Sequence, residues 1–121
     1  MNGINKPVKL YITLTSPYAR LARIVVLEKE LDDKVEQIIA KTRQADSPYY
    51  QVNPSGRVPC LILSDGTRLE ESQLVCSYLD HLDAAPRFEA PIGTEGLQVR
   101  RLEALARSLM DGVSVWIREG F

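Results

Sequence analysis

A proline that directly follows a β-branched residue is the sequence feature that most constrains the fold of this 121-residue chain. It ends the turn-rich segment Asn53-Pro54-Ser55-Gly56-Arg57-Val58-Pro59; an apolar run and an Asp65-Gly66 turn follow. Because the ring of Pro59 restricts the residue before it, Val58 is held extended at the tip of a strand. If the Val58-Pro59 bond is cis, the amide and carbonyl of Val58 point away from the sheet toward a ligand. The segment therefore predicts an edge that pairs with a peptide.

The first 40 residues show the patterns of a strand, a helix and a second strand. Residues 8–14 alternate apolar and polar side chains, which predicts a strand. Ser16-Pro17 starts a helix, because serine caps the free amides and proline is favoured at the first helical position. That helix runs to Leu31, and its apolar residues occupy more than one face, so we expect it to be covered on two sides. Residues 34–40 predict a second strand, parallel to the first.

The remainder predicts a hairpin, a helix and a further long helix. Residues 41–53 are polar and indicate a loop with one helical turn, and residues 58–63 predict a strand antiparallel to a short fourth strand. A helix with one apolar stripe follows Ser72. Residues 84–93 break all periodicity, and an apolar stripe then continues from Thr94 to the end of the chain. A single helix with such a face needs other helices to cover it.

This order predicts an α/β fold in two parts. Residues 1–84 form a thioredoxin-like βαβ-ββα domain with a mixed four-stranded sheet, and residues 85–93 form a linker. Residues 94–121 form the first helix of a truncated all-α domain.

Composition excludes several classes of function. Fifteen basic and 16 acidic residues leave a net charge of -1, and no basic segment is interleaved with aromatics, so nucleic acid is not expected as a partner. The N-terminus lacks a signal-peptide core, and no run approaches the ~20 apolar residues of a membrane span. The chain is therefore expected in the cytoplasm, away from membranes. Cys60 and Cys76 match no redox or zinc spacing and are interpreted as buried thiols; with His81 as the one histidine, no metal site is expected.

Four motifs, in this order along the chain, resemble the bacterial glutathione S-transferase family. They are Thr15-Ser16-Pro17-Tyr18-Ala19-Arg20, Asn53-Pro54-Ser55-Gly56-Arg57-Val58-Pro59, Glu71-Ser72 with Tyr78-Leu79, and Arg101-Leu102-Glu103-Ala104-Leu105-Ala106. The resemblance covers about the whole chain, as the N-terminal domain and the opening of the C-terminal one. It implies an enzyme that transfers the glutathione thiolate to a small hydrophobic electrophile. It also implies a homodimer that uses glutathione as co-substrate and no cofactor.

The resemblance also implies how glutathione is held. The backbone of Val58 pairs with the cysteinyl part of glutathione, and Pro59 sets that geometry. Ser72 and the start of its helix receive the γ-glutamyl carboxylate, while Glu71 faces the ammonium. Arg57 could contact a ligand carboxylate. The structural alternative is a turn that binds nothing, followed by an ordinary helix N-terminus.

Ser16 is the candidate catalytic hydroxyl under this resemblance. A thiol of pKa ~8.5 is mostly protonated at neutral pH, and a hydrogen bond from Ser16 would favour the thiolate. Ser16 is equally suited to be only a helix cap. The absence of cysteine at this position argues against the glutathione-thiol exchange of cysteine-bearing classes.

Two alternatives to an enzyme stay open. A non-catalytic relative of the stringent starvation protein A type uses the same fold to bind the transcription machinery. An inactive or regulatory fragment with an exposed helical face is the other alternative.

Overall fold

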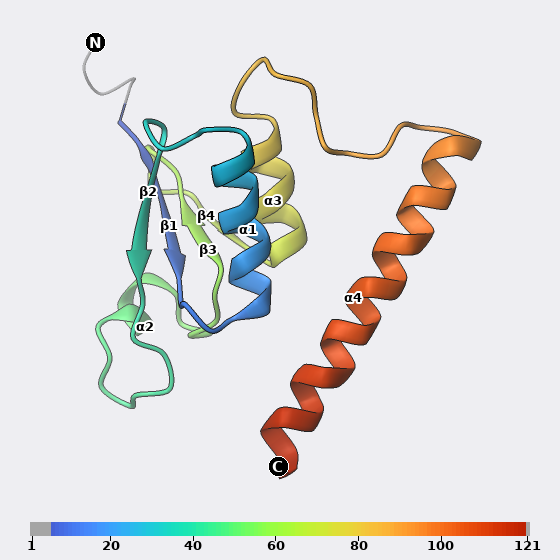
Figure 1. The fold of residues 1–121 in the computed structure, drawn as a ribbon. Helices are drawn as coiled ribbons and strands as arrows, with labels where there is room; N and C mark the ends of the chain where they lie inside the picture. Colours follow the sequence, from blue (N-terminus) through green and yellow to red (C-terminus); the bar gives the residue numbers. More distant parts are fainter. Residues whose placement is uncertain (1–5, 121) are drawn as a thin grey trace. The chain divides into compact units, whose positions relative to one another are not determined.

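The structure, a computed structural model, describes residues 6–120 and confirms the predicted order of strands and helices (Figure 1). The elements are β1 (Val8–Ile12), α1 (Pro17–Glu28), β2 (Val35–Ile39), α2 (Tyr49–Val52), β3 (Cys60–Ile62), β4 (Arg68–Glu70), α3 (Ser72–Asp80) and α4 (Thr94–Gly120). They fall into two compact units, Met1–Arg87 and Phe88–Phe121. Residues 1–5 and 121, which end the predicted domains, lie outside the described residues.

The predicted mixed four-stranded sheet is confirmed, with strand order β2-β1-β3-β4. β1 pairs with β2 in parallel, as predicted, and antiparallel with β3, which pairs antiparallel with β4. β3 begins at Cys60 rather than at the predicted Val58. Pro59 has no amide hydrogen to give to a ladder, so the paired strand starts after it. Val58 therefore lies beside the sheet edge without belonging to the strand.

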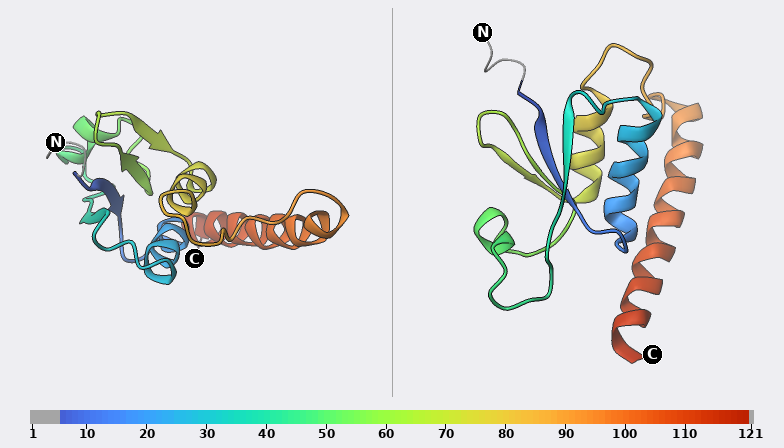
Figure 2. Two further views of the ribbon diagram at one scale, coloured as in Figure 1. Left: turned by 90° about the horizontal axis from the view of Figure 1, so that it is seen from above. Right: turned by 60° about the vertical axis from the view of Figure 1, so that its left-hand side comes forward.

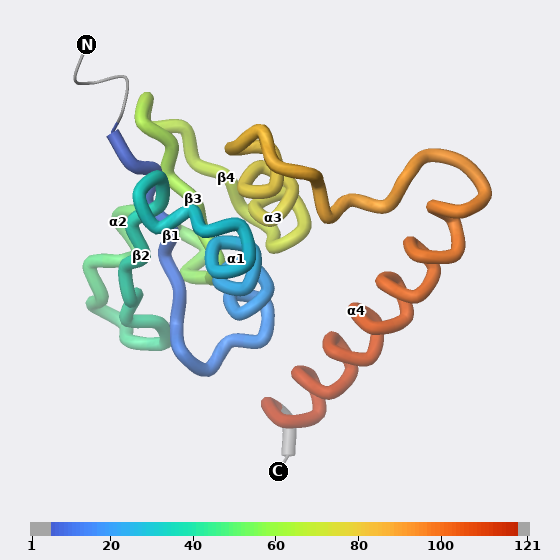
Figure 3. Tube along the Cα trace, turned by 45° about the horizontal axis from the view of Figure 1, so that its top comes forward, coloured from blue at the N-terminus to red at the C-terminus, as the bar shows by residue number. Residues whose placement is uncertain are grey.

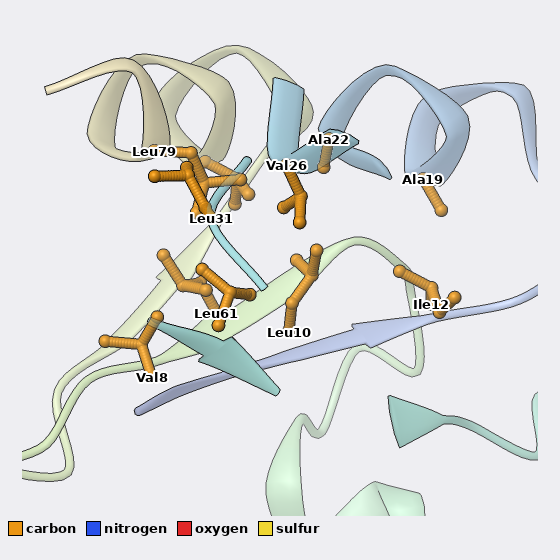
Figure 4. Packing of buried hydrophobic residues seen from close by; sticks show 11 residues of the cluster. Val8, Leu10, Ile12, Ala19, Ala22, Val26, Leu31, Leu61 and Leu79 are labelled. Carbon is orange, nitrogen blue, oxygen red and sulfur yellow. The ribbon is translucent and has the colours of Figure 1, made fainter. Parts of the chain in front are cut away.

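One face of the sheet carries the main core, and α1 and α3 lie side by side over it (Figures 2 and 3). Alternation along β1 turns Val8, Leu10 and Ile12 toward the helices, where α1 contributes Ala19 and Val26 (Figure 4). Leu10 is fully buried, and burying a leucine side chain stabilises a fold by about 1.5–3 kcal/mol. The apolar face that alternation gives to β1 and the apolar face that the helical period gives to α1 thus pack into one core.

Within its own unit, Met1–Arg87, α1 is covered on one side, by the sheet and α3, and not on the predicted second side. Ile24 is 47% exposed and Leu27 is 68% exposed, although both belong to the apolar pattern of the helix. The small Ala19 and Ala22 are fully buried and bring the opposite face of the helix against the sheet. The apolar surface of α1 is therefore wider than the sheet and α3 can cover.

The long helix α4 forms most of the second unit. Its apolar stripe is exposed in the described residues, with Leu102 at 67% and Leu109 at 69%. Among the helices of residues 6–120, none is both long enough and apolar enough to cross a membrane.

A buried lysine, which the sequence analysis did not single out, ties the end of α1 to the end of α3. The Lys29 side chain is 2% exposed, and its Nζ donates to the Asp80 carbonyl at 2.6 Å and to Asp80 Oδ1 at 3.0 Å. It also pairs with Asp83 Oδ1 at 2.9 Å. Burial alone would lower the pKa of Lys29, but the two carboxylates outweigh it and raise the pKa. The hydrogen bond from Lys29 holds the pKa of Asp83 below its usual 3.8.

We expect Lys29→Met to remove the acid sensitivity that this network gives to the fold. Because the folded pKa of Asp83 is depressed, its stabilising contribution is present above 3.8 and is lost as the pH falls through the lower folded value. In Lys29→Met, Asp83 loses the lysine that depresses its pKa, so protonation of this carboxyl should no longer lower stability. Urea unfolding at neutral pH and below pH 3.8 measures the difference.

The control is Lys34→Met, which removes an exposed lysine and should keep the wild-type pH dependence. A Lys29→Met variant whose unfolding free energy falls with acid as steeply as that of the wild type would contradict this role.

Candidate functional site

The sheet register brings three predicted site segments together at one end of the strands, and this end is the edge that carries the candidate site. Cys60, the first residue of β3, pairs with Tyr11 of β1 on one side and with Glu70 of β4 on the other. The chain leaves β1 and β4 at this edge and enters β3 there. Ser16, Val58-Pro59 and Glu71-Ser72 each lie within a few residues of that row. Figure 1 accordingly shows α1 and α3 starting at the same end of the sheet.

The width of this edge suits a short extended peptide. Adjacent strands lie about 4.8 Å apart, so β1 and β4, which flank β3, are separated by about 10 Å. A fully extended chain spans about 3.3–3.6 Å per residue, or about 10 Å for a tripeptide. An extended tripeptide lying across β3 could therefore reach from the end of β1 to the end of β4.

The main chain of Val58 offers both a donor and an acceptor at the centre of the edge. The Val58-Pro59 peptide is cis. Within residues 6–120, neither the amide nor the carbonyl of Val58 has a hydrogen-bond partner. Val58 is half-buried, and its side chain packs against the core. Its backbone can therefore pair with an incoming strand.

The residue before Val58 is held from two directions. The Arg57 carbonyl accepts a 2.6 Å hydrogen bond from the Tyr49 hydroxyl and a 3.0 Å bond from Nδ2 of Asn53, which is 1% exposed. Burial raises the pKa of Tyr49, so the phenol stays protonated and donates. The Tyr49 ring in turn contacts the ring of Tyr11, with centroids 5.4 Å apart. These contacts fix the carbonyl that directly precedes Val58.

The turn itself requires a glycine at position 56. Gly56 has φ +72, and its amide donates to the Asn53 carbonyl at 2.9 Å. A Cβ at this position would lie 2.7 Å from Cε1 of Tyr50. Asn53 Oδ1 accepts from the Ser55 amide at 3.3 Å. The oxygen and the nitrogen of the Asn53 side chain are therefore both hydrogen-bonded within the turn. Position 56 therefore combines a left-handed backbone with a close approach of the Tyr50 ring, which would have to shift to admit a Cβ.

Ser16 caps α1 and keeps a proton that can serve a ligand. Its Oγ accepts from the Ala19 amide at 3.1 Å, as the predicted cap requires. A hydroxyl has one donor and two acceptor positions, so accepting from Ala19 leaves the hydrogen available. Ser16 is half-buried and lies in the segment between β1 and α1. Capping and donation to a thiolate are therefore compatible.

Glu71 and Ser72 differ in their surroundings. Glu71 is exposed and has φ 73, a backbone conformation that costs a residue with a side chain about 1–3 kcal/mol. Its carboxylate makes no cap hydrogen bond, and no ion pair to it is found among the described residues. Ser72 is buried as the first residue of α3, whose opening turn presents backbone amides. The pair thus offers a carboxylate beside amide donors.

The other sequence candidates have less specific positions. The Arg57 side chain is exposed, so burial does not fix it toward the edge. Cys60 is buried, as predicted, and burial raises the pKa of its thiol. Cys76 is half-buried rather than fully buried.

Sequence reasoning missed the support given by Tyr49 and Asn53. The one helical turn predicted within residues 41–53 is α2, but the segment is not all polar surface, because Tyr49 is 5% exposed. Asparagine followed by proline and glycine was recognised only as turn chemistry. The available signal was that an asparagine side chain can bond its own turn, which the structure shows here.

Residues 15–82 match the family described as glutathione S-transferase, N-terminal domain. The chain is 35% identical over 111 residues to the uncharacterized GST-like protein YibF of Escherichia coli (strain K12), covering 92% of this chain and 54% of that protein. It is 30% identical over 111 residues to Glutathione S-transferase 2 of Saccharomyces cerevisiae, covering 88% of this chain and 48% of that protein. The chain thus spans about half the length of these curated relatives.

A solved structure gives the same family. A glutathione S-transferase from Methylobacillus flagellatus KT, with glutathione bound, superposes with a TM-score of 0.81 at 36% identity. The match covers 93% of this chain and 55% of that one.

Proposed function

Because the chain belongs to the glutathione S-transferase family, we propose that it binds glutathione at the Ser16, Val58 and Glu71-Ser72 edge and directs its thiolate to a small electrophile. The observation that carries this proposal is the unpaired backbone of Val58 between two helix N-termini on one sheet edge. A cap needs only the Ser16 oxygen as an acceptor, so the hydroxyl proton left over is what the proposed enzyme uses. The glutathione bound to the structurally similar transferase supports the choice of ligand.

In the proposed complex, glutathione lies extended across the start of β3. The amide and carbonyl of Val58 pair with the cysteinyl residue, as a strand added to a sheet edge does. Tyr49 and Asn53 keep the Arg57 carbonyl in place, so little ordering of the protein is needed on binding. The exposed side chain of Arg57 is not held in one position, and it can approach a ligand carboxylate.

Glu71 and Ser72 hold the γ-glutamyl end of the ligand. The first amides of α3 and the Ser72 hydroxyl receive the carboxylate, and the positive end of the helix dipole favours it. The carboxylate of Glu71 then faces the ammonium group. The ligand ammonium thus meets the carboxylate of Glu71, and the ligand carboxylate meets the uncharged donors of Ser72 and the helix start.

Ser16 donates a hydrogen bond to the glutathione sulfur while its oxygen caps α1. The bond favours the thiolate after the thiol proton has passed to solvent. The sulfur then forms a bond to the electrophilic carbon, and the leaving group departs with its electron pair. We propose a small hydrophobic electrophile and a homodimer, in keeping with the family resemblance.

We expect calorimetric titration with glutathione to detect binding to the wild-type chain. Ser72→Ala removes a donor to a charged group, and bonds of that kind support a loss of about tenfold or more in affinity. Ser64→Ala is the matched control, because that exposed hydroxyl donates to the Lys6 carbonyl at the hairpin between β3 and β4. It should bind like the wild type. A wild-type chain that gives no heat with glutathione would overturn the proposed function.

Substitutions at Ser16 separate catalysis from capping. Ser16→Asp keeps a cap acceptor but has no proton to donate, so we expect near wild-type stability with conjugation of an aryl halide reduced about 10- to 100-fold. Ser16→Thr keeps both functions and should keep most of the rate. Turnover in Ser16→Asp equal to that of the wild type would reject Ser16 as the catalytic hydroxyl. Glutathione binding without turnover in the wild type would favour a non-catalytic binding protein.

A further inference from the structure

A second set of polar contacts ties the turn before Val58 to the end of β4. The Ser55 hydroxyl donates to Glu70 Oε1 at 3.2 Å, and the same Ser55 oxygen accepts from the Arg57 amide at 3.2 Å. The other carboxylate oxygen, Glu70 Oε2, pairs with Arg68 Nε at 3.0 Å. The carboxylate of Glu70 is therefore engaged on both oxygens, one of them by the turn.

The two neighbouring glutamates consequently have different surroundings. Glu70 is the last residue of β4, and its side chain faces the turn. Glu71 follows it directly, turns the chain with a positive φ, and is not bonded to the turn. Only Glu71 has a carboxylate left for a ligand ammonium. The side chain of Glu70 instead joins the segment that presents Val58 to the segment that presents Glu71 and Ser72.

We propose that Glu70 is a positioning residue of the glutathione site, which sets the spacing between the Val58 backbone and the Glu71-Ser72 pair by holding Ser55. This inference rests on the proposed function for its ligand, whereas the contacts themselves are independent of it. Glu70 does not touch glutathione. It acts through Ser55 and the Arg57 amide on Val58, whose backbone contacts glutathione.

A surface ion pair alone would not have this effect. The side chains of Arg68 and Glu70 are 41% and 36% exposed, and exposed pairs contribute little to stability. The bond from Ser55 is exposed as well, but it links residues 15 apart in sequence and restrains the turn from a side that Tyr49 and Asn53 do not hold. Loss of that bond should loosen the turn while leaving the core unaffected.

The test compares Glu70→Ala, Glu70→Gln, Ser55→Ala and the double variant in the full 121-residue chain. Because the Ser55 hydroxyl loses its acceptor, we expect Glu70→Ala to raise the glutathione dissociation constant about 3- to 10-fold. Glu70→Gln keeps an acceptor for Ser55 and should restore most of the affinity. The double variant should be no weaker than Ser55→Ala, since both changes break one contact. The thermal midpoint should stay near that of the wild type, and Glu36→Ala, an exposed glutamate on β2, is the control.

Two results with a binding-competent wild type would overturn the proposal. In the first, Glu70→Ala binds glutathione like the wild type. In the second, Glu70→Gln binds as weakly as Glu70→Ala, which would mean that the charge acts on the ligand directly.

Hydrogen exchange of the Arg57 amide separates this proposal from the proposed function. That amide donates to Ser55, so its exchange should quicken in Glu70→Ala without any ligand. If the wild type does not bind glutathione, the proposed function fails, and faster exchange still supports Glu70 as the residue that positions the turn. Unchanged exchange of Arg57 in Glu70→Ala would overturn the positioning role.

Discussion

The pairing of Cys60 with Tyr11 and Glu70 is the constraint on which the candidate site depends. Because β3 runs antiparallel to both neighbours, this one row fixes where the chain leaves β1, enters β3 and leaves β4. A slip of one residue would turn every side chain of β3 to the opposite face and take Leu61 out of the main core. Burial of the core therefore also specifies the alignment of the edge. The main chain of Val58 is left unpaired at its centre.

The main chain at this edge is held by some interactions that stabilise the fold and by one backbone conformation that destabilises it. The Arg57 carbonyl accepts two hydrogen bonds, and Gly56 takes a positive φ that its lack of a side chain permits. Glu71 takes a similar φ with a side chain present, which costs stability. Strain of this kind persists only where the surrounding structure enforces it, and here the well-packed start of α3 does so. A carboxylate on an unfavourable backbone, for which residues 6–118 supply no ion-pair partner, is consistent with a ligand-binding role.

Periodicity and cap chemistry were sufficient to predict the order of strands and helices, including the Ser16-Pro17 start of α1. Motifs identified Val58 and the Glu71-Ser72 pair as candidates, because local turn and helix rules apply to them. Contacts between distant side chains could not be predicted in this way. Lys29 and Asp80 are 51 residues apart, and no local pattern encodes their pairing. The hydrogen bond from Ser55 to Glu70 could not be predicted for the same reason, since each residue alone is typical of exposed polar positions.

The most direct measurement of the central claim is an amide nuclear magnetic resonance titration of the chain with glutathione, observed at Val58. If the Val58 backbone pairs with the cysteinyl residue, its amide signal should shift with ligand and its hydrogen exchange should slow. The amide of Ile38, on the far edge strand β2, should stay in place. A saturating titration that moves other signals and leaves the Val58 amide unchanged in both shift and exchange would contradict the claim.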